Sequence, residues 1–162
     1  MAVHELYVQE RRVHLIVRAT VSDLDDVYEF LSKNFYPEHD FPGETGLSEE
    51  KARDYMFRYL QGGVVFNALQ NGKIVGSISL GEASLWWSED RYLGDGWFYV
   101  LPKARKSRVA IRLINEAFRY GEERGLPVVI GIWNADDIDR KDKFFIRKGM
   151  KRIGAWYMKG KF

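Results

Sequence analysis

Three basic side chains stand together at the predicted start of a helix. Arg105, Lys106 and Arg108 follow Pro102 and come directly before a helical repeat that begins at Val109. The first N–H groups of a helix have no partner within it, and the helix dipole is positive at that end. Joined by three cations, these groups form a binding site for a phosphate-bearing ligand. The pattern is also compatible with a charged helix start that contacts only water.

A strand and an amphipathic helix enclose this basic run. Residues 97–101 are rich in aromatic and β-branched side chains, and Pro102 ends the strand because it cannot donate a hydrogen bond to a sheet. Ser107 is the expected N-cap of the helix that follows. One face of that helix carries Val109, Ala110, Leu113, Ile114, Ala117, Phe118 and Gly121. This spacing is typical of a helix with one buried face.

The rest of the sequence predicts further elements. Strands are expected at 6–9, 14–18, 64–69, 73–80, 128–133 and 151–158, the run 128–133 being apolar throughout as in a buried central strand. Helices are expected at 23–31 after Ser22, at 48–60 capped by Ser48, and at 140–147 ended by Gly149. Asn71-Gly72 indicates a hairpin, whereas 34–47 and 81–94 are expected to be irregular. From residue 14 the order is β-α-α-β-β-β-α-β-α-β, an α/β arrangement with a mixed sheet.

Composition limits the class of protein. The 162 residues suffice for one domain, residues 1–162, with a substantial core. The absence of cysteine excludes disulfides, thiolate metal sites and a cysteine nucleophile, and no spacing of histidines and carboxylates predicts a metal site. Without a signal-peptide pattern or an apolar run long enough to span a membrane, a cytoplasmic protein is expected. The net charge of +2 is too small for bulk nucleic-acid binding.

The basic run resembles the cofactor loop of the GNAT acyltransferase superfamily, Arg/Gln-x-x-Gly-x-Gly/Ala, which follows a strand and a proline and opens a helix. Here Arg105-Lys106-Ser107-Arg108-Val109-Ala110 matches the first and last positions, and Arg108 replaces the middle glycine. The order of elements from about position 14 is also that of the family. The Arg-Lys-Ser variant is similar to that of phage and prophage members. The resemblance implies a mixed, mostly antiparallel sheet flanked by helices, whose two central strands splay apart to admit coenzyme A.

The activity implied by the resemblance is transfer of an acetyl or other acyl group from acetyl-CoA to an amine, by direct attack in a ternary complex. The backbone of Val100 and Leu101 would pair with the pantetheine arm, and the Val100 N–H would polarise the thioester carbonyl. The pyrophosphate would lie against Arg105, Lys106, Ser107, Arg108, Val109 and Ala110. Asn134 holds the place of an asparagine near the pantetheine arm, although a turn at the strand end explains it equally well.

The family's proton donor is missing. Many members have Phe-Tyr-x-x-x-Gly-Phe, whose tyrosine protonates the leaving thiolate, and this chain has Phe144-Phe145-Ile-Arg-Lys-Gly149-Met150. Phe145 takes the tyrosine position in the cofactor site and has no proton to give. Water, Tyr157 or Tyr99 could act instead. Alternatively, the chain is a non-catalytic or weakly active acyl-CoA-binding module, a hypothesis that Arg108 and Phe145 support.

Candidate bases precede the strand at Trp97. Asp95 and Glu82 rank first, ahead of Glu89 and Asp90, although any single carboxylate there can simply be a solvated loop residue. The acceptor side would come from Phe35, Tyr36, Glu38, His39, Asp40 and Phe41, together with Trp86 and Trp87. Aromatics beside carboxylates suit a small-molecule or protein amine of apolar or cationic character. The same residues could also be a packed loop or a dimer contact, and the family allows a homodimer.

Overall fold

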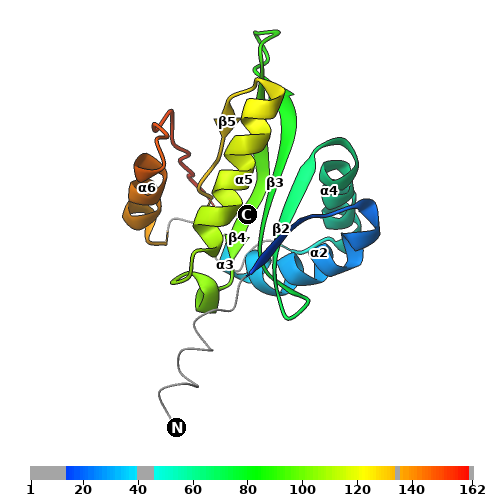
Figure 1. The fold of residues 1–162 in the computed structure, drawn as a ribbon. Helices are drawn as coiled ribbons and strands as arrows, with labels where there is room; N and C mark the ends of the chain where they lie inside the picture. Colours follow the sequence, from blue (N-terminus) through cyan, green and yellow to red (C-terminus); the bar gives the residue numbers. More distant parts are fainter. Residues whose placement is uncertain (1–13, 40–45, 134–135, 161–162) are drawn as a thin grey trace.

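The computed structural model describes residues 14–39, 46–133 and 136–160. Its sheet contains β1 (Leu15–Arg18), β2 (Val64–Gln70), β3 (Lys73–Ser84), β4 (Arg91–Val100) and β5 (Val128–Val129), in that spatial order. The first four strands are antiparallel neighbours, and β5 runs parallel to β4 (Figure 1). This is the mixed, mostly antiparallel sheet that the sequence predicts.

Helices cover both faces of the sheet. The described helices are α2 (Leu24–Phe30), α3 (Tyr36–His39), α4 (Glu49–Gly62), α5 (Val109–Arg124) and α6 (Ile138–Arg147), with a π-helical turn at Leu31–Phe35 and 3-10 turns at Val21–Asp23 and Pro102–Ala104. The apolar face of α5 packs against one side of the sheet, and α2 and α4 pack against the other (Figure 1). No helix in the described ranges is long and apolar enough to cross a membrane.

The alternation of side chains along β4 joins the two cores. Trp97 and Tyr99 belong to the core under α2 and α4, whereas Phe98 and Val100 face the core under α5. Each strand residue therefore points to the opposite face from its neighbour, as a pleated strand requires. A strand buried on both faces can position groups at its edge with little freedom.

A β-bulge interrupts the pairing of β3 with β4. The register passes from Ile78 opposite Phe98 to Leu80 opposite Asp95, so β4 carries one extra residue. The Ser79 hydroxyl oxygen accepts hydrogen bonds from the N–H groups of Gly96 (3.1 Å) and of Trp97, the next residue (3.0 Å). The bulge bends the strand beside Asp95, as bulges commonly do near functional sites.

Beyond the bulge, β4 and β5 part. They pair only at Leu93 with Val128 and at Gly94 with Val129, so residues 95–100 of β4 have no strand partner on this side within the described residues. This opening between β4 and β5 corresponds to the splay of the two central strands that the resemblance to the GNAT superfamily implies. The β4 backbone at this edge is available to pair with another extended group.

Two regions differ from the sequence predictions because their structure depends on distant contacts. Within the segment 81–94, which was expected to be irregular, β3 continues to Ser84 and β4 begins at Arg91, so only 85–90 connect the strands, and the long hairpin has its tip at Trp86 and Trp87. The run 128–133 forms only the two-residue β5 at the sheet edge, because the Gly131 N–H bonds to the Asp95 carboxylate instead of a strand.

The chain ends also differ from prediction. The predicted strand at 151–158 is not formed; these residues are exposed and pair with no strand among the described residues. The helical stretch that starts at Val21 follows Thr20, whose N–H donates to Asp23 Oδ2 (2.7 Å), and continues in turns to His39, well past Leu31. The predicted strand at 6–9 lies outside the described residues.

Candidate active site

The basic loop connects the end of β4 to α5, as expected. Pro102–Ala104 forms a 3-10 turn, and α5 begins at Val109, so its N-cap position belongs to Arg108 instead of Ser107. Ser107 still closes the loop: its hydroxyl donates to the Ala104 carbonyl (2.5 Å) and accepts from the Val109 N–H (3.3 Å). The start of a 16-residue helix and the cations of this loop thus lie beside the open edge of β4.

The N–H of Val100 points toward this open edge. Leu101 donates to the Val75 carbonyl (2.9 Å), so the pair of Gly76 and Val100 next to it is a non-hydrogen-bonded pair of the antiparallel ladder. The Val100 N–H and carbonyl therefore face away from β3. Arg105 Nε donates to that carbonyl (2.9 Å), which fixes the guanidinium at the same edge.

Arg105 also reaches a carboxylate on α3. Its Nη2 donates to both oxygens of Glu38 (2.8 and 3.1 Å), and the Tyr99 hydroxyl donates to Glu38 Oε1 (2.6 Å). Burial raises the pKa of Glu38, but the bonds from Tyr99 and Arg105 outweigh it and hold that pKa below its ordinary value. Burial and the bond to Glu38 raise the pKa of Tyr99. The cluster therefore contains an ionised carboxylate and a protonated phenol at neutral pH.

Aromatic rings surround this cluster on the α3 side. His39 stacks on Phe35 with ring centroids 3.9 Å apart, and Tyr99 contacts both rings edge-on at 5.9 and 6.2 Å. Burial lowers the pKa of His39. Of the proposed acceptor-side residues, Phe35, Glu38 and His39 are thus brought close to the basic loop, while Asp40 and Phe41 lie outside the described residues.

Asp95 has the properties of a general base. Its Oδ1 accepts a hydrogen bond from the Gly131 N–H (3.0 Å), and burial raises its pKa to about 6. The ring of Tyr59 lies against the neighbouring Gly96, where an added Cβ would come within 2.7 Å of Tyr59 Cε2. A carboxylate with a pKa near the working pH is suited to accept a proton.

Glu82 lies in a different environment. It forms ion pairs with Arg91 (2.6 Å) and with Arg124 at the end of α5. The hydrogen bonds from these two arginines lower its pKa. A carboxylate stabilised in this way is a weaker base than Asp95, and its evident contribution is to join the β3–β4 hairpin to α5.

The remaining candidates lie apart from one another. Phe145 on α6 contacts Phe98 on the open part of β4, with ring centroids 6.2 Å apart. Tyr157 is 93% exposed in the unpaired segment near the chain end. Trp86 and Trp87 are exposed at the hairpin tip, at the opposite end of β4 from the basic loop (Figure 1). Asn134 lies outside the described residues.

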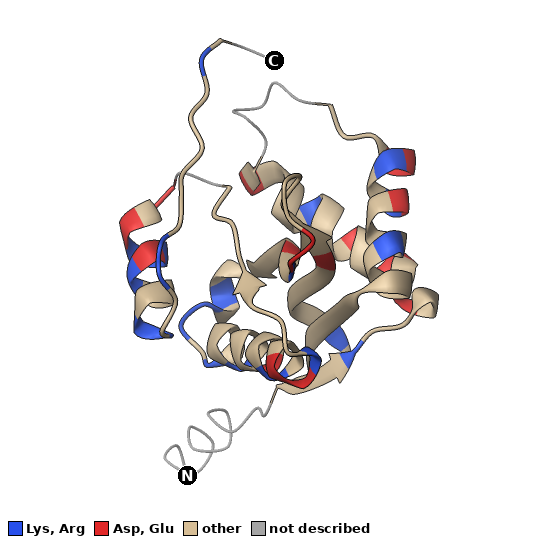
Figure 2. Cartoon of the chain, turned by 90° about the horizontal axis from the view of Figure 1, so that it is seen from above, with Lys and Arg blue, Asp and Glu red and all other residues tan. Residues whose placement is uncertain are grey.

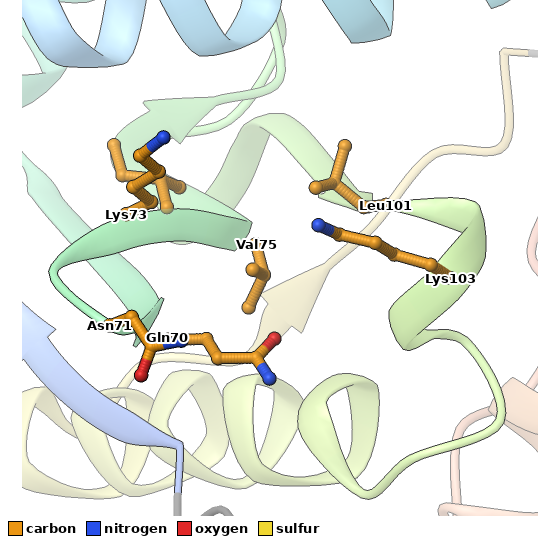
Figure 3. Close-up of a pocket in the computed structure, with 7 residues that line it drawn as sticks. Gln70, Asn71, Lys73, Val75, Leu101 and Lys103 are labelled. Atoms are coloured by element: carbon orange, nitrogen blue, oxygen red, sulfur yellow. The ribbon is translucent and has the colours of Figure 1, made fainter.

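A shallow hollow adjoins the basic loop on the side of the β2–β3 hairpin. Its volume is about 340 Å³, and it is lined by Gln70, Asn71, Lys73, Ile74, Val75, Leu101 and Lys103. Lys103 extends across it from the loop toward Val75 (Figure 3). Elsewhere, Lys and Arg are interspersed with Asp and Glu along the helices (Figure 2), which agrees with the small net charge of +2. Within the described ranges, no three metal-ligating side chains gather.

The mixed sheet, the open β4 edge and the basic helix start define an α/β protein with a site suited to an extended anionic ligand. The Acetyltransferase (GNAT) family profile matches residues 24–149, most of the chain. The chain belongs to this family of acetyltransferases. Comparison with curated protein sequences found no match.

Solved structures share the fold at low sequence identity. A predicted acetyltransferase from Clostridium acetobutylicum, solved with acetyl-CoA, superposes with a TM-score of 0.71 at 13% identity, covering 91% of this chain and 96% of the other. An aminoglycoside acetyltransferase from an uncultured soil metagenomic sample, in complex with sisomicin, gives 0.65 at 20% identity over 91% and 97%. Ribosomal-protein-alanine N-acetyltransferase from Brucella melitensis biovar Abortus 2308 gives 0.65 at 17% identity over 91% and 99%.

Proposed function

We propose that this protein transfers an acetyl group from acetyl-CoA to the amine of a small molecule. The observation that carries the proposal is the open edge of β4, where the Val100 N–H points outward next to the basic loop. An extended amide-containing arm can pair with such an edge as a strand does. The start of α5 supplies N–H groups and positive charge for phosphates. The residues present therefore fit the cofactor that the family implies.

In this proposal, each part of the cofactor meets a separate feature. The outward-facing edge of β4 at Val100 pairs with the pantetheine arm, and the loop 105–110 holds the pyrophosphate. Leu101, which the resemblance also implied, does not take part, because its N–H donates to the Val75 carbonyl and its carbonyl accepts from the Ala104 N–H. The cofactor supplies the activated thioester. The Val100 N–H donates to the carbonyl oxygen on which negative charge develops, a contact whose removal typically costs about 10²–10³ in rate where it has been measured.

Asp95 serves as the base in this proposal. An amine attacks only when it is neutral, and a carboxylate with a pKa of about 6 can take its proton near neutral pH. Phe145 has no proton to give, Tyr157 is exposed to solvent, and the Tyr99 hydroxyl already donates to Glu38. We therefore assign protonation of the leaving thiolate to water. A small-molecule acceptor is supported by the aminoglycoside acetyltransferase of the same fold.

The test is calorimetric titration with acetyl-CoA, with NAD as a control for unspecific dinucleotide binding, followed by assay of free thiol release with a panel of amines. Binding of acetyl-CoA alone and amine-dependent thiol release are the expected results. No binding at millimolar concentration would refute the proposal.

A second function, binding of an acyl-CoA without turnover, is favoured by one observation. Phe145 packs against Phe98 of β4, so an apolar ring takes the place where the resemblance to the family implies a tyrosine hydroxyl. Under this alternative, acetyl-CoA binds in the calorimeter, but no amine in the panel releases thiol above the rate without amine. The same pair of measurements thus distinguishes the two functions.

A further inference from the structure

One carboxylate already interacts with the cation of the proposed cofactor loop that lies at the open edge of β4. Glu38 receives two hydrogen bonds from Arg105 Nη2, at 2.8 and 3.1 Å, and a third from the Tyr99 hydroxyl at 2.6 Å. A guanidinium binds phosphate through the same N–H donors that it offers to a carboxylate. Glu38 thus occupies donors that an incoming phosphate would use.

We propose that Glu38 is an internal anion that competes with the phosphates of the cofactor for Arg105, and that it thereby sets the affinity for acetyl-CoA. The proposal rests on the function proposed above, because it requires that acetyl-CoA bind at the loop. It assigns to Glu38 a positioning role, since Glu38 acts through Arg105 and need not contact the cofactor.

The geometry allows an exchange of partners. The Arg105 side chain is 36% exposed, so an anion can reach it while Glu38 is still bound. Its Nε bond to the Val100 carbonyl keeps the guanidinium at the open edge after Glu38 leaves. Glu38 in turn keeps the Tyr99 hydroxyl as a donor, which avoids leaving a partly buried carboxylate without a partner.

The exchange would also link the two substrates. Glu38 lies on α3, next to the stacked rings of Phe35 and His39 on the proposed acceptor side. The Arg105–Glu38 ion pair ties this segment to the cofactor loop across 67 positions of sequence. When phosphates take Arg105, α3 loses that tie, so cofactor binding would loosen the segment where the acceptor is proposed to bind.

The experiment is a double-mutant cycle on acetyl-CoA affinity, measured by calorimetry. Glu38→Gln should bind acetyl-CoA about two- to tenfold more tightly, because Arg105 is released, and Arg105→Gln should bind it more weakly. In the Arg105→Gln background, Glu38→Gln should have no further effect, since the competition requires both groups. Glu29→Gln is the matched control: it removes the same charge from the preceding helix, where Glu29 pairs with Lys33.

Unchanged or weaker binding by Glu38→Gln, or an equal gain in the Arg105→Gln background, would overturn the competition. If the unmutated protein itself fails to bind acetyl-CoA, the proposed function fails, which is a distinct result. Hydrogen exchange on the unmutated protein gives a readout that does not depend on variants folding. The amides of Tyr36, Glu38 and His39 should exchange faster when acetyl-CoA saturates the protein, and unchanged or slower exchange would refute the link to α3.

Discussion

The Asp95 carboxylate accepts a hydrogen bond from the Gly131 N–H at 3.0 Å, and this contact joins the bulge of β4 to the chain just beyond β5. It stands where the two parallel strands cease to pair. Burial removes water from this carboxyl group, and the backbone hydrogen bonds from Gly131 and from Asp95 itself compensate only in part, so its pKa rises to about 6. The same group that ends the strand pairing is therefore the best candidate base.

Asp95→Asn should abolish most of the activity without unfolding the protein. Loss of a general base typically lowers kcat about 10²–10⁴-fold. In the unmutated enzyme, kcat/KM should rise with pH through about 6, because the carboxylate is active only when deprotonated. This rise of kcat/KM with pH, the acidic limb of the pH profile, should be absent in Asp95→Asn. Steady-state assays between pH 5 and 8 check both points, and an unaltered limb in Asp95→Asn would exclude Asp95 as the base.

The same substitution should stabilise the fold at neutral pH. The folded-state pKa of Asp95 lies above its unfolded value, so the group favours folding below about pH 4 and loses this contribution as pH rises through about 6. Asparagine carries no such cost, and the gain at pH 7 should approach about 3 kcal/mol, the equivalent of two pKa units. Urea unfolding at pH 4 and pH 7 measures it. If the free energies of unfolding of Asp95→Asn and the unmutated protein differ by the same amount at pH 4 and pH 7, the raised pKa of Asp95 would be contradicted.

Glu82→Gln should leave the reaction largely intact. Glu82 is held by Arg91 and Arg124, so its removal should affect the hairpin and not the proton transfer. We expect kcat within about twofold of the unmutated enzyme, against the loss of orders of magnitude for Asp95→Asn. If kcat instead falls strongly and the rise of kcat/KM with pH moves away from about pH 6, Glu82 would be the better candidate for the base.

Phe145→Tyr should raise turnover, because it places a hydroxyl beside the open edge of β4. A positioned general acid contributes about 10²–10⁴-fold, so a measurable rise in kcat is expected where thiolate departure limits the rate. Phe144→Tyr, one residue earlier on α6, is the matched control. If both variants fold and neither changes kcat, water or another group supplies the proton efficiently.

Gly96→Ala should destabilise the protein through crowding at the bulge. An added Cβ would lie 2.7 Å from the Ser79 hydroxyl oxygen and 2.7 Å from Tyr59 Cε2. Overpacking of this kind costs about 1–3 kcal/mol. Gly62→Ala is the control, since its Cβ meets no atom within 4 Å. Thermal or urea unfolding of the pair provides the measurement, and equal stability would show that the Tyr59 ring can move aside.

Sequence patterns predicted the elements whose causes are local. The Ser48 hydroxyl caps α4 by accepting a hydrogen bond from the backbone N–H of Lys51. Asn71 and Gly72 adopt the positive φ values of a tight hairpin turn. The buried face of α5 follows from its spacing of apolar residues. Gly149 likewise takes a positive φ after α6. Each of these outcomes depends on neighbours within a few positions.

Longer-range contacts could not be read from sequence. The short length of β5 depends on the bond between Gly131 and Asp95, 36 positions apart. The sequence singled out Asp95 and Glu82 together, and only their partners in space distinguish the carboxyl group with a raised pKa from the carboxylate paired with two arginines. Glu38 and Arg105 were each expected at the site, but no pattern indicates that they bind one another. The paired glycines around Asp95 were the one available signal of a bulge.

The Ser79 hydroxyl fixes the register of β4 against β3, and with it the open edge of β4. Its single oxygen saturates two consecutive N–H groups at the bulge, so β4 cannot slide along β3 without leaving both unpaired. A slip of one residue would turn the outward N–H of Val100 inward, toward β3, and would close the edge to a ligand. The spacing along β4 between Asp95, the proposed base, and the Val100 N–H, the proposed donor to the oxyanion, is thus fixed by one hydroxyl group on the neighbouring strand.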